Sequence, residues 1–347
     1  MDIFLTILVV ISLLFTILSI IRNDNWAFRI FDYPRLQKFV FSFLCLLLLF
    51  IFFKNTLYYY ILIVLVLINI LYIGYLIFPF TFFAKKQVLN ASSVKDEDTL
   101  SIMIANVYQD NTNYSGCLNQ IKSANPDIVL LIETNKYWEE NTNELSENFA
   151  YCKKVPQENT YGMLLYSKYE LLNLEVKYLV EDDIPSIHTF IKLKNGVDVR
   201  LFAVHPTPPV PNENIRSTER DKELLLVADM AEKCKDPVIV FGDLNDVAWS
   251  YTTKLFLKMS GLLDPRKGRG FYNSFHAHYF FMRFPLDHAF ISKHFKLVSM
   301  KRCKNFNSDH FPIYIKLQYD KNAILQQESM EKDADDVKLA NEKKSKI

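Results

Sequence analysis

Three long stretches near the start of the chain contain no charged residue. They run from Ile3 to Ile21, from Phe39 to Phe53 and from Asn55 to Ala84, and are 19, 15 and 30 residues long. Because a helix needs about 20 apolar residues to cross a bilayer, we predict that residues 1–84 form a membrane anchor with three transmembrane helices. The middle stretch is short, but Lys38 and Lys54 at its ends can extend their charged heads into the interface. Buried core helices are the alternative interpretation.

The rest of the chain alternates short apolar runs with amphipathic stretches. The runs that predict strands lie at residues 100–106, 128–133, 162–167, 187–193, 199–205, 238–243, 287–292 and 312–317. Residues 213–235 have the apolar spacing of one long helix. We therefore predict a linker at 85–98 and a single α/β domain at 99–318. Residues 319–347 combine many charges with little apolar periodicity, which predicts a solvated, disordered tail.

Charge is distributed as unevenly as the apolar residues. The chain is 50% hydrophobic and 23% charged, yet its first 84 residues contain only eight charged side chains. The remainder has 35 Lys and Arg against 36 Asp and Glu. This near-neutral balance disfavours a protein that grips nucleic acid through many phosphates. The five cysteines follow neither a disulfide framework nor a zinc-finger spacing.

The loops of the predicted anchor differ in positive charge. Residues 22–38 contain Arg22, Arg29, Arg35 and Lys38, whereas the second loop has a single lysine. Because short, positively charged loops stay on the cytoplasmic side, we predict an external N-terminus and a cytoplasmic α/β domain. Aromatic residues among these charges leave a second interpretation open, an interfacial segment whose arginines bind lipid phosphates on either face of the membrane.

Four of the predicted strands end in a polar residue that can bind a metal or form hydrogen bonds. These residues are Asn106, Glu133, His205 and Asp243. Open α/β sheets usually bind ligands at the carboxyl ends of their strands. Each residue alone is more often part of a turn, but four such strand ends in one domain indicate a ligand site.

The segment Gly242-Asp243-Leu244-Asn245 has the most specific composition of these strand ends. Glycine permits a close approach between backbone and ligand, and the carboxylate of Asp243 can activate a water molecule. Asn245 projects to the same side two residues later and can donate a hydrogen bond to a phosphate oxygen. An ordinary turn after a buried strand remains the alternative for this segment alone.

Two further pairs place a carboxylate beside an imidazole. They are Asp287-His288, at the start of a predicted strand, and Asp309-His310, which follows Ser308. A carboxylate can fix the tautomer of an imidazole that transfers protons near neutral pH, and it can also bind a hard cation such as Mg²⁺. Isolated pairs of this kind usually lie in surface loops.

The order and spacing of these residues resemble those of the endonuclease/exonuclease/phosphatase superfamily, which has the DNase I-like fold. The resemblance covers residues 99–318 and includes YGMLLYSKYEL at 161–171, which is similar to the family's central strand. It implies a four-layer α/β/β/α sandwich with the active site at the rim of the sheets. It also implies a bound Mg²⁺ or Mn²⁺ ion and hydrolysis of a phosphoester by in-line attack of water.

The same resemblance implies a role for each candidate residue. The metal ligands would be Glu133, Asn106 and Asp309, and the catalytic residues would be His205, Asp243, Asn245, Asp287 and His310. In these roles His310 is the catalytic histidine oriented by Asp287, Asp243 aligns or deprotonates the water, and the remaining two face the phosphate. Two positions after Asn106, where some family nucleases have an acidic ligand, this chain has Tyr108. This departure counts against a second tightly held metal but does not decide between one metal and two.

A narrower resemblance concerns the anchor and two loops. The three apolar stretches, WAFRIFDYPRLQ at 26–37 and GLLDPRKGRG at 261–270 are similar to a membrane-anchored bacterial branch of the superfamily, which implies the inner membrane. Arg266, Lys267 and Arg269 in the second loop either bind a phosphate or lipid headgroup or form a solvated loop. Trp249 and Ser250 are expected to pack against and cap the following helix. No role is assigned to His276, His278 and His294.

Together these patterns predict a membrane-anchored, divalent-metal-dependent phosphoesterase. Its substrate would be either nucleic acid or a phosphorylated lipid or small molecule, and its other partner would be the lipid bilayer. No protein partner can be deduced from the sequence. The alternative is a non-catalytic membrane module that uses the same fold for binding.

Overall fold

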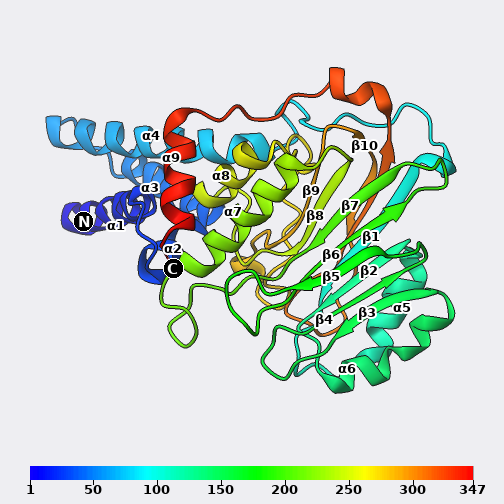
Figure 1. Ribbon diagram of the computed structural model, residues 1–347. Helices are drawn as coiled ribbons and strands as arrows, with labels where there is room; N and C mark the ends of the chain where they lie inside the picture. Colours follow the sequence, from blue (N-terminus) through cyan, green and yellow to red (C-terminus); the bar gives the residue numbers. More distant parts are fainter. Residues whose placement is uncertain (347) are drawn as a thin grey trace.

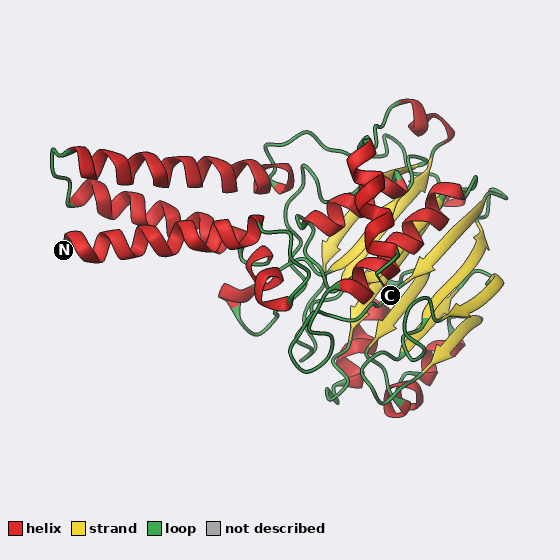
Figure 2. Cartoon of the chain, turned by 60° about the vertical axis from the view of Figure 1, so that its left-hand side comes forward, coloured by secondary structure: helices red, strands yellow, loops and turns green. Residues whose placement is uncertain are grey.

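The computed structural model describes residues 1–346. Three long helices project together from one side of a larger domain (Figures 1 and 2). They are α1 (Asp2–Ile20), α3 (Arg35–Ile51) and α4 (Leu57–Ile77). Leu5, Leu49 and Val66 pack between these helices, while many of their outward side chains are apolar and exposed. Helices that are apolar on all sides are typical of protein cores and membranes.

Two of these helices are long and apolar enough to cross a membrane. They are Asp2–Ile20, with a mean hydropathy of 2.9, and Leu57–Phe80, with a mean hydropathy of 2.8. The third qualifies only if Trp26–Asp32 and Arg35–Ile51, which are bent by 70° relative to each other, count as one span. The described residues thus provide two or three candidate spans, and the number three stays a prediction.

The domain contains two mixed sheets. The first has the order β10 (Phe295–Arg302), β11 (Ile313–Tyr319), β1 (Thr99–Asn106), β2 (Ile128–Ile132), β4 (Met163–Ser167) and β3 (Tyr151–Val155). The second has the order β5 (Leu172–Lys177), β6 (Ser186–Lys192), β7 (Asp198–Ala203), β8 (Val238–Asp243) and β9 (Asp287–Ile291). Neighbouring strands are antiparallel except for the parallel pairs β1–β2 and β7–β8. Each strand alternates its side chains between the two faces of its sheet.

The two sheets pack face to face, and helices cover their outer faces. Ile102 and Leu130 of the first sheet meet Leu201 and Ile239 of the second in the core between them. The outer helices are α5 (Tyr114–Ala124) and α6 (Lys136–Asn141) on the first sheet, and α7 (Thr218–Lys233) and α8 (Tyr251–Ser260) on the second. Strands buried on both faces explain the nearly continuous apolar runs of the sequence. The predicted α/β domain is confirmed, and its layers agree with a DNase I-like sandwich.

Short helices and turns complete the chain. They are α2 (Trp26–Arg29), α9 (Ala334–Lys344) and the 3₁₀ turns η1 (Ile30–Asp32), η2 (Phe78–Phe80), η3 (Asp96–Asp98), η4 (Asn143–Glu147), η5 (Phe280–Met282) and η6 (Lys321–Leu325). We call residues 21–34, which join α1 to α3, the connector. The backbone N–H of Trp26 in the connector donates to the carbonyl oxygen of Ile215 at 2.8 Å, and Asn25 pairs with Arg216.

The connector explains why the long helix begins later than predicted. The apolar spacing predicts a helix over residues 213–235, but α7 begins at Thr218. Ile215 and Arg216 use their backbone groups to pair with the connector, so they cannot take part in the first turn of the helix. Spacing along α7 contains no information about a partner almost 200 residues earlier in the chain.

The predicted disordered tail is wrong for residues 334–344, which form α9. This helix, red in Figure 1, lies across α7 and α8 on the side of the domain nearest the bundle. Ala340 is buried, and the ammonium group of Lys343 lies 2.8 Å from Asp24 and 2.7 Å from Asp221. The charges that predicted a solvated tail are therefore partly paired. The predicted linker also packs onto the domain, because Val88 is fully buried and Leu89 pairs with Leu297.

Candidate active site

Three strand ends meet at one edge of the two sheets, as their positions in the sequence predict. Asn106 closes β1, Glu133 follows β2, and Asp243 closes β8 of the other sheet. The amide nitrogen Nδ2 of Asn106 donates to Oε1 of Glu133 at 2.6 Å and to Oδ2 of Asp243 at 3.1 Å. One asparagine thus joins the acidic groups of both sheets.

Gly242 permits the close approach of two strands immediately before Asp243. Its φ is +147°, and a Cβ atom placed there would lie 1.9 Å from the carbonyl oxygen of Val204, so no other residue fits. After the glycine, Oδ1 of Asp243 accepts the backbone N–H of Asn245 at 2.9 Å, and Asn245 adopts a φ of +49°. Asparagine tolerates this left-handed conformation better than most residues.

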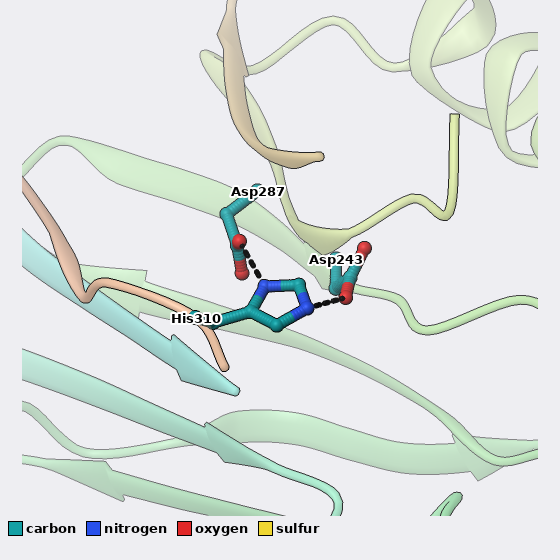
Figure 3. A group of neighbouring side chains, drawn as sticks. All are labelled: Asp243, Asp287 and His310. Carbon is teal, nitrogen blue, oxygen red and sulfur yellow. Dashed lines mark hydrogen bonds and ion pairs between the residues drawn. The ribbon is translucent and has the colours of Figure 1, made fainter. Parts of the chain in front are cut away.

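His310 lies between two buried carboxylates (Figure 3). Its Nδ1 is 2.7 Å from Oδ2 of Asp287, and its Nε2 is 3.6 Å from Oδ2 of Asp243. Burial lowers the pKa of the imidazole, but the two neighbouring carboxylates outweigh burial and raise this pKa to about 10. The hydroxyl of Ser308 fixes the loop, because it accepts the His310 N–H and donates to the carbonyl oxygen of Asn106.

A second imidazole lies on the other side of Asp243. The amide of Asn245 lies 3.3 Å from Nε2 of His205 and also donates to the carbonyl oxygen of Pro206 at 3.0 Å. An amide nitrogen can only donate, so Nε2 accepts and the proton of the neutral ring resides on Nδ1. Burial lowers the pKa of His205 to about 4. The site therefore combines a protonated imidazole and a neutral one.

Glu133 has the environment of a cation ligand. Removal from water raises the pKa of its carboxyl group to about 7, although the hydrogen bond from Asn106 opposes this rise. Asp309 adds a negative charge nearby, and its Oδ1 is buried without a hydrogen-bond partner among the described residues. Carboxylate and amide oxygens with unfilled acceptor positions suit a hard divalent cation, so Glu133, Asn106 and Asp309 fit the predicted metal site.

Another group also has metal-ligand spacing. Ligand atoms of Asp243, Asp287 and His310 all lie within 4.8 Å of one another. However, the imidazole occupies the space between these carboxylates and is held by both of them. We therefore interpret this trio as a proton-transfer group and the Glu133 cluster as the better cation site. Tyr108 is partly exposed, and its backbone N–H donates to Oδ1 of Asn106.

Two residues that the sequence did not indicate support the loop at 243–245 from behind. The carbonyl oxygen of Asn245 accepts hydrogen bonds from the Tyr33 hydroxyl at 2.9 Å and from Nη1 of Arg220 at 2.6 Å. Arg220 is fully buried and also pairs with Asp221. Tyr33 belongs to the connector, whose charges and aromatic residues we interpreted as signs of membrane topology. Arg220 lies in the first turn of α7, and nothing in the sequence around it indicates that its side chain is buried.

The connector makes further contacts with the segment after this loop. Arg29 lies 3.7 Å from Asp246, and the indole N–H of Trp249 donates to the carbonyl oxygen of Asp32 at 2.8 Å. Trp249 is buried, and the Ser250 side chain accepts the backbone N–H of Thr253, so the expected packing and capping roles are confirmed. The connector, at the end of the bundle nearest the domain, thus packs against the α/β domain.

Two of the three basic residues in the loop at 261–270, Arg266 and Arg269, match neither of the two interpretations. Arg266 is buried and pairs with Asp264 at 2.9 Å, and its Nη2 lies 2.6 Å from Nδ1 of His288. Arg269 donates to the backbone carbonyl oxygens of Val88 and Pro265. These guanidinium groups stabilise the loop and the linker, and they are neither solvated nor directed at a ligand. His288 is structural too, because its Nε2 bonds to the Asp246 carbonyl oxygen.

Comparison with known families agrees with this geometry. A model described as the endonuclease/exonuclease/phosphatase family matches residues 103–310, which extend from β1 to His310. The chain belongs to this family. Its members are hydrolases that act on phosphoester bonds, as the family's name indicates.

Solved structures show the same fold at low sequence identity. The human Nocturnin catalytic domain with bound sulfate superimposes with a TM-score of 0.53 at 18% identity, covering 69% of this chain and 98% of that one. TDP2 from D. rerio, complexed with a single-strand DNA product, gives 0.53 at 18%, with 63% and 99% covered. A functionally unknown protein from Enterococcus faecalis gives 0.51 at 13%, with 64% and 100% covered. None of the curated proteins matches significantly.

Proposed function

We propose that this protein is a membrane-anchored, divalent-metal-dependent phosphodiesterase, nuclease or phosphatase that hydrolyses its substrate by in-line attack of water. The arrangement of His310 between Asp287 and Asp243, beside the acidic Glu133, carries this proposal. Membership of the family provides the reaction class, and the arrangement assigns tasks to individual side chains.

His310 and its carboxylates would manage the protons. Asp287 occupies Nδ1, so only Nε2 is directed toward the substrate side, where Asp243 lies. With its raised pKa, the protonated ring can donate a hydrogen bond or a proton to a phosphoryl or leaving oxygen. Asp243 is positioned to orient the attacking water and accept its proton. The Asn245 amide and the neutral His205 would bind phosphoryl oxygens without adding charge.

The metal site of the proposal consists of Glu133, Asn106 and Asp309. A divalent cation, Mg²⁺ or Mn²⁺, would neutralise charge on the phosphoryl oxygens there. The unpartnered oxygen of Asp309 and the raised pKa of Glu133 support this assignment, because both indicate negative groups that lack a positive partner.

We further propose that α1, α3 and α4 hold the enzyme in a bacterial inner membrane, with the catalytic domain in the cytoplasm. The connector and the residues that follow α4 lie at the same end of the bundle as the domain. The basic residues of the connector and Lys85-Lys86 therefore favour one cytoplasmic side. Both nucleic acids and phosphorylated lipids fit this proposal.

The test is hydrolysis by the full chain in lipid nanodiscs. The substrates are bis-p-nitrophenyl phosphate, single-stranded DNA, RNA and a set of phospholipids, each with Mg²⁺ or with EDTA. We expect metal-dependent cleavage that falls at least about a hundredfold in His310→Ala, the usual cost of removing a general acid or base. His294→Ala, which changes a histidine outside the site, is the matched control. If folded protein cleaves nothing, the enzyme proposal fails in favour of a binding module.

A further inference from the structure

A short loop beside the catalytic histidine exposes four large apolar side chains. Tyr279, Phe280, Phe281 and Met282, which we call the aromatic loop, are between 52% and 79% exposed. A contiguous apolar patch of this kind on a folded domain usually marks a surface for a protein, a membrane or a ligand. The aromatic loop has no internal apolar periodicity, so nothing in the sequence analysis indicated it.

Contacts at its two ends place the aromatic loop between the active site and the helix bundle. On one side, the Ala277 N–H donates to the carbonyl oxygen of Asp309 at 2.6 Å, and the ring of Phe275 lies 5.0 Å from that of His310. On the other side, the Gln37 amide in the first turn of α3 donates to the carbonyl oxygen of Phe281 at 2.7 Å. The loop therefore joins the catalytic residues to the base of the bundle.

A second exposed aromatic pair lies at the same end of the bundle. Phe82 and Phe83 follow α4 after one turn and are 79% and 90% exposed. Phe82 also lines a hollow of about 600 Å³, together with Gly270 and Arg302. Both α3 and α4 have exposed apolar side chains up to the end that adjoins the domain. The aromatic loop and Phe82-Phe83 therefore extend the apolar exterior of the bundle.

Two arginines lie between these aromatic groups and the catalytic histidine. The guanidinium groups of Arg283 and Arg302 stack on Phe311, at 5.1 Å and 4.3 Å from its ring centre. Arg302 is exposed, and Nε of Arg283 has no hydrogen-bond partner among the described residues. Guanidinium groups bind phosphate oxygens well, and aromatic side chains favour the interface between headgroups and acyl chains.

We propose that the aromatic loop and Phe82-Phe83 insert into the headgroup layer of the bilayer that holds the bundle, and that the active site hydrolyses a phospholipid from this layer. The inference rests on the proposed function and narrows its substrate class to membrane lipids. Arg283 and Arg302 would hold the headgroup phosphate near His310. The contact of the aromatic loop with α3, at the base of a bundle with an apolar exterior, favours a lipid over a soluble nucleic acid, because a lipid in the same bilayer would be delivered directly to the site.

Insertion can be tested independently of activity. The full chain carrying Phe281→Trp is placed in nanodiscs of phosphatidylcholine and phosphatidylglycerol, with or without nitroxide-labelled lipid. The fluorescence added by the new tryptophan should be quenched by the labelled lipid. Tyr137→Trp is the control, because Tyr137 is 64% exposed on α6, on the far sheet. Equal quenching of the two added signals would overturn the insertion.

The substrate class is tested with Phe280→Ser combined with Phe281→Ser, using Tyr137→Ser as the control. In nanodiscs that contain phosphatidylglycerol, cardiolipin, phosphatidic acid, phosphoinositides or sphingomyelin, the double variant should lose roughly tenfold in lipid hydrolysis. Its hydrolysis of soluble bis-p-nitrophenyl phosphate should not change. Cleavage of the soluble ester without cleavage of any lipid, or equal loss on both, overturns this inference and leaves the proposed function intact. Cleavage of neither contradicts the proposed function itself.

Discussion

His310 and Glu133 lie in one site but have opposite electrostatic environments. Two carboxylates next to His310 favour its charged form, whereas burial of Glu133 disfavours its charge. A positively charged imidazole and a carboxylate with little positive charge around it, both near Asp243, suit a phosphate anion that is accompanied by a cation. At the scale of single residues, this contrast is consistent with the proposed binding of a metal and a phosphoester substrate.

Replacing Glu133 with glutamine tests its role as a ligand. Glu133→Gln keeps the size of the side chain and one oxygen that can accept the hydrogen bond from Asn106, but it removes the charge. We expect the Mg²⁺ concentration for half-maximal activity to rise by about tenfold or more. A metal titration of phosphoester hydrolysis measures this change, with Glu140→Gln on the exposed side of α6 as the control. An unchanged titration would remove Glu133 from the metal site.

His188 gives a prediction for stability, away from the active site. Burial, aided by the nearby Arg200, lowers its pKa to about 3, and its Nε2 lies 3.0 Å from the Ser186 hydroxyl. The unfolded chain takes up this proton below about pH 6.5, whereas the folded chain resists it until about pH 3. The stabilisation is thus complete above about pH 6.5 and is lost as the pH falls toward the folded pKa.

The variant His188→Gln should remove this pH dependence. Between about pH 6 and pH 4, the unfolding free energy of the wild type should fall by up to about 1.4 kcal/mol per pH unit more than that of the variant. Urea unfolding of both chains across this range measures the difference in slope, and all other histidines contribute equally to both. Parallel pH profiles would contradict the buried neutral state of His188.

At the scale of elements, α9 and the connector are held by charge pairs that join distant parts of the chain. Lys343 brings together Asp24 of the connector, Asp221 of α7 and the hydroxyl of Tyr251 on α8. All of these groups are largely removed from water, so the cost of an unpaired charge is high. The ammonium group of Lys343 therefore links α9 to the connector, to α7 and to α8.

Removing that ammonium group should destabilise the domain. We expect Lys343→Met to lower the unfolding free energy by about 3 kcal/mol, the lower end for a broken buried pair, because Arg220 still pairs with Asp221. Lys344→Met is the matched control. Its partner Asp229 is more exposed, so it should cost less than about 1 kcal/mol. Thermal unfolding of the two variants compares them, and equal shifts would refute the role of Lys343.

The distinction between local and distant interactions also explains what the sequence could predict at this scale. Asn106, Glu133 and Asp243 were found because each directly follows an apolar strand, and the strand itself predicts where its end lies. The roles of Tyr33, Arg220 and Lys343 depend on partners in other elements, and charge or spacing near each residue contains no trace of them. The aromatic loop could not be predicted for the same reason, because the exposure of its side chains depends on the rest of the fold.

At the scale of the whole molecule, the helix bundle and the α/β domain are one folded unit. Tyr33 of the connector donates a hydrogen bond to the loop at 243–245, and the connector also packs against Trp249. The predicted linker is held to the domain by the burial of Val88 and by its hydrogen bond with Arg269. The boundaries at 84 and 99 therefore separate sequence compositions and not independently folding parts. The strands of the α/β domain were predictable from their alternation, whereas this union was not.

A fragment without the connector tests whether contacts with the connector stabilise the domain. We expect residues 85–347 to unfold at a lower temperature than the full chain in nanodiscs and to bind a dye specific for exposed apolar surface, because Trp249 and Arg220 lose their cover. A peptide of residues 21–38 added to the fragment should raise the unfolding temperature, and the same peptide with Arg29→Ala should raise it less. A fragment as stable as the full chain would contradict the prediction.

The contacts of the connector also impose an order on biosynthesis. The ribosome synthesises Arg29, Asp32 and Tyr33 between two apolar helices, α1 and α3. Their partners, in and after the loop at 243–245, are translated much later. Lys343 is translated after all the strands and then pairs with Asp24, among the earliest residues made. If α1 and α3 enter a bilayer as proposed, they do so while the loop at 243–245 still lacks its support, and the proposed hydrolytic activity would then arise only after insertion.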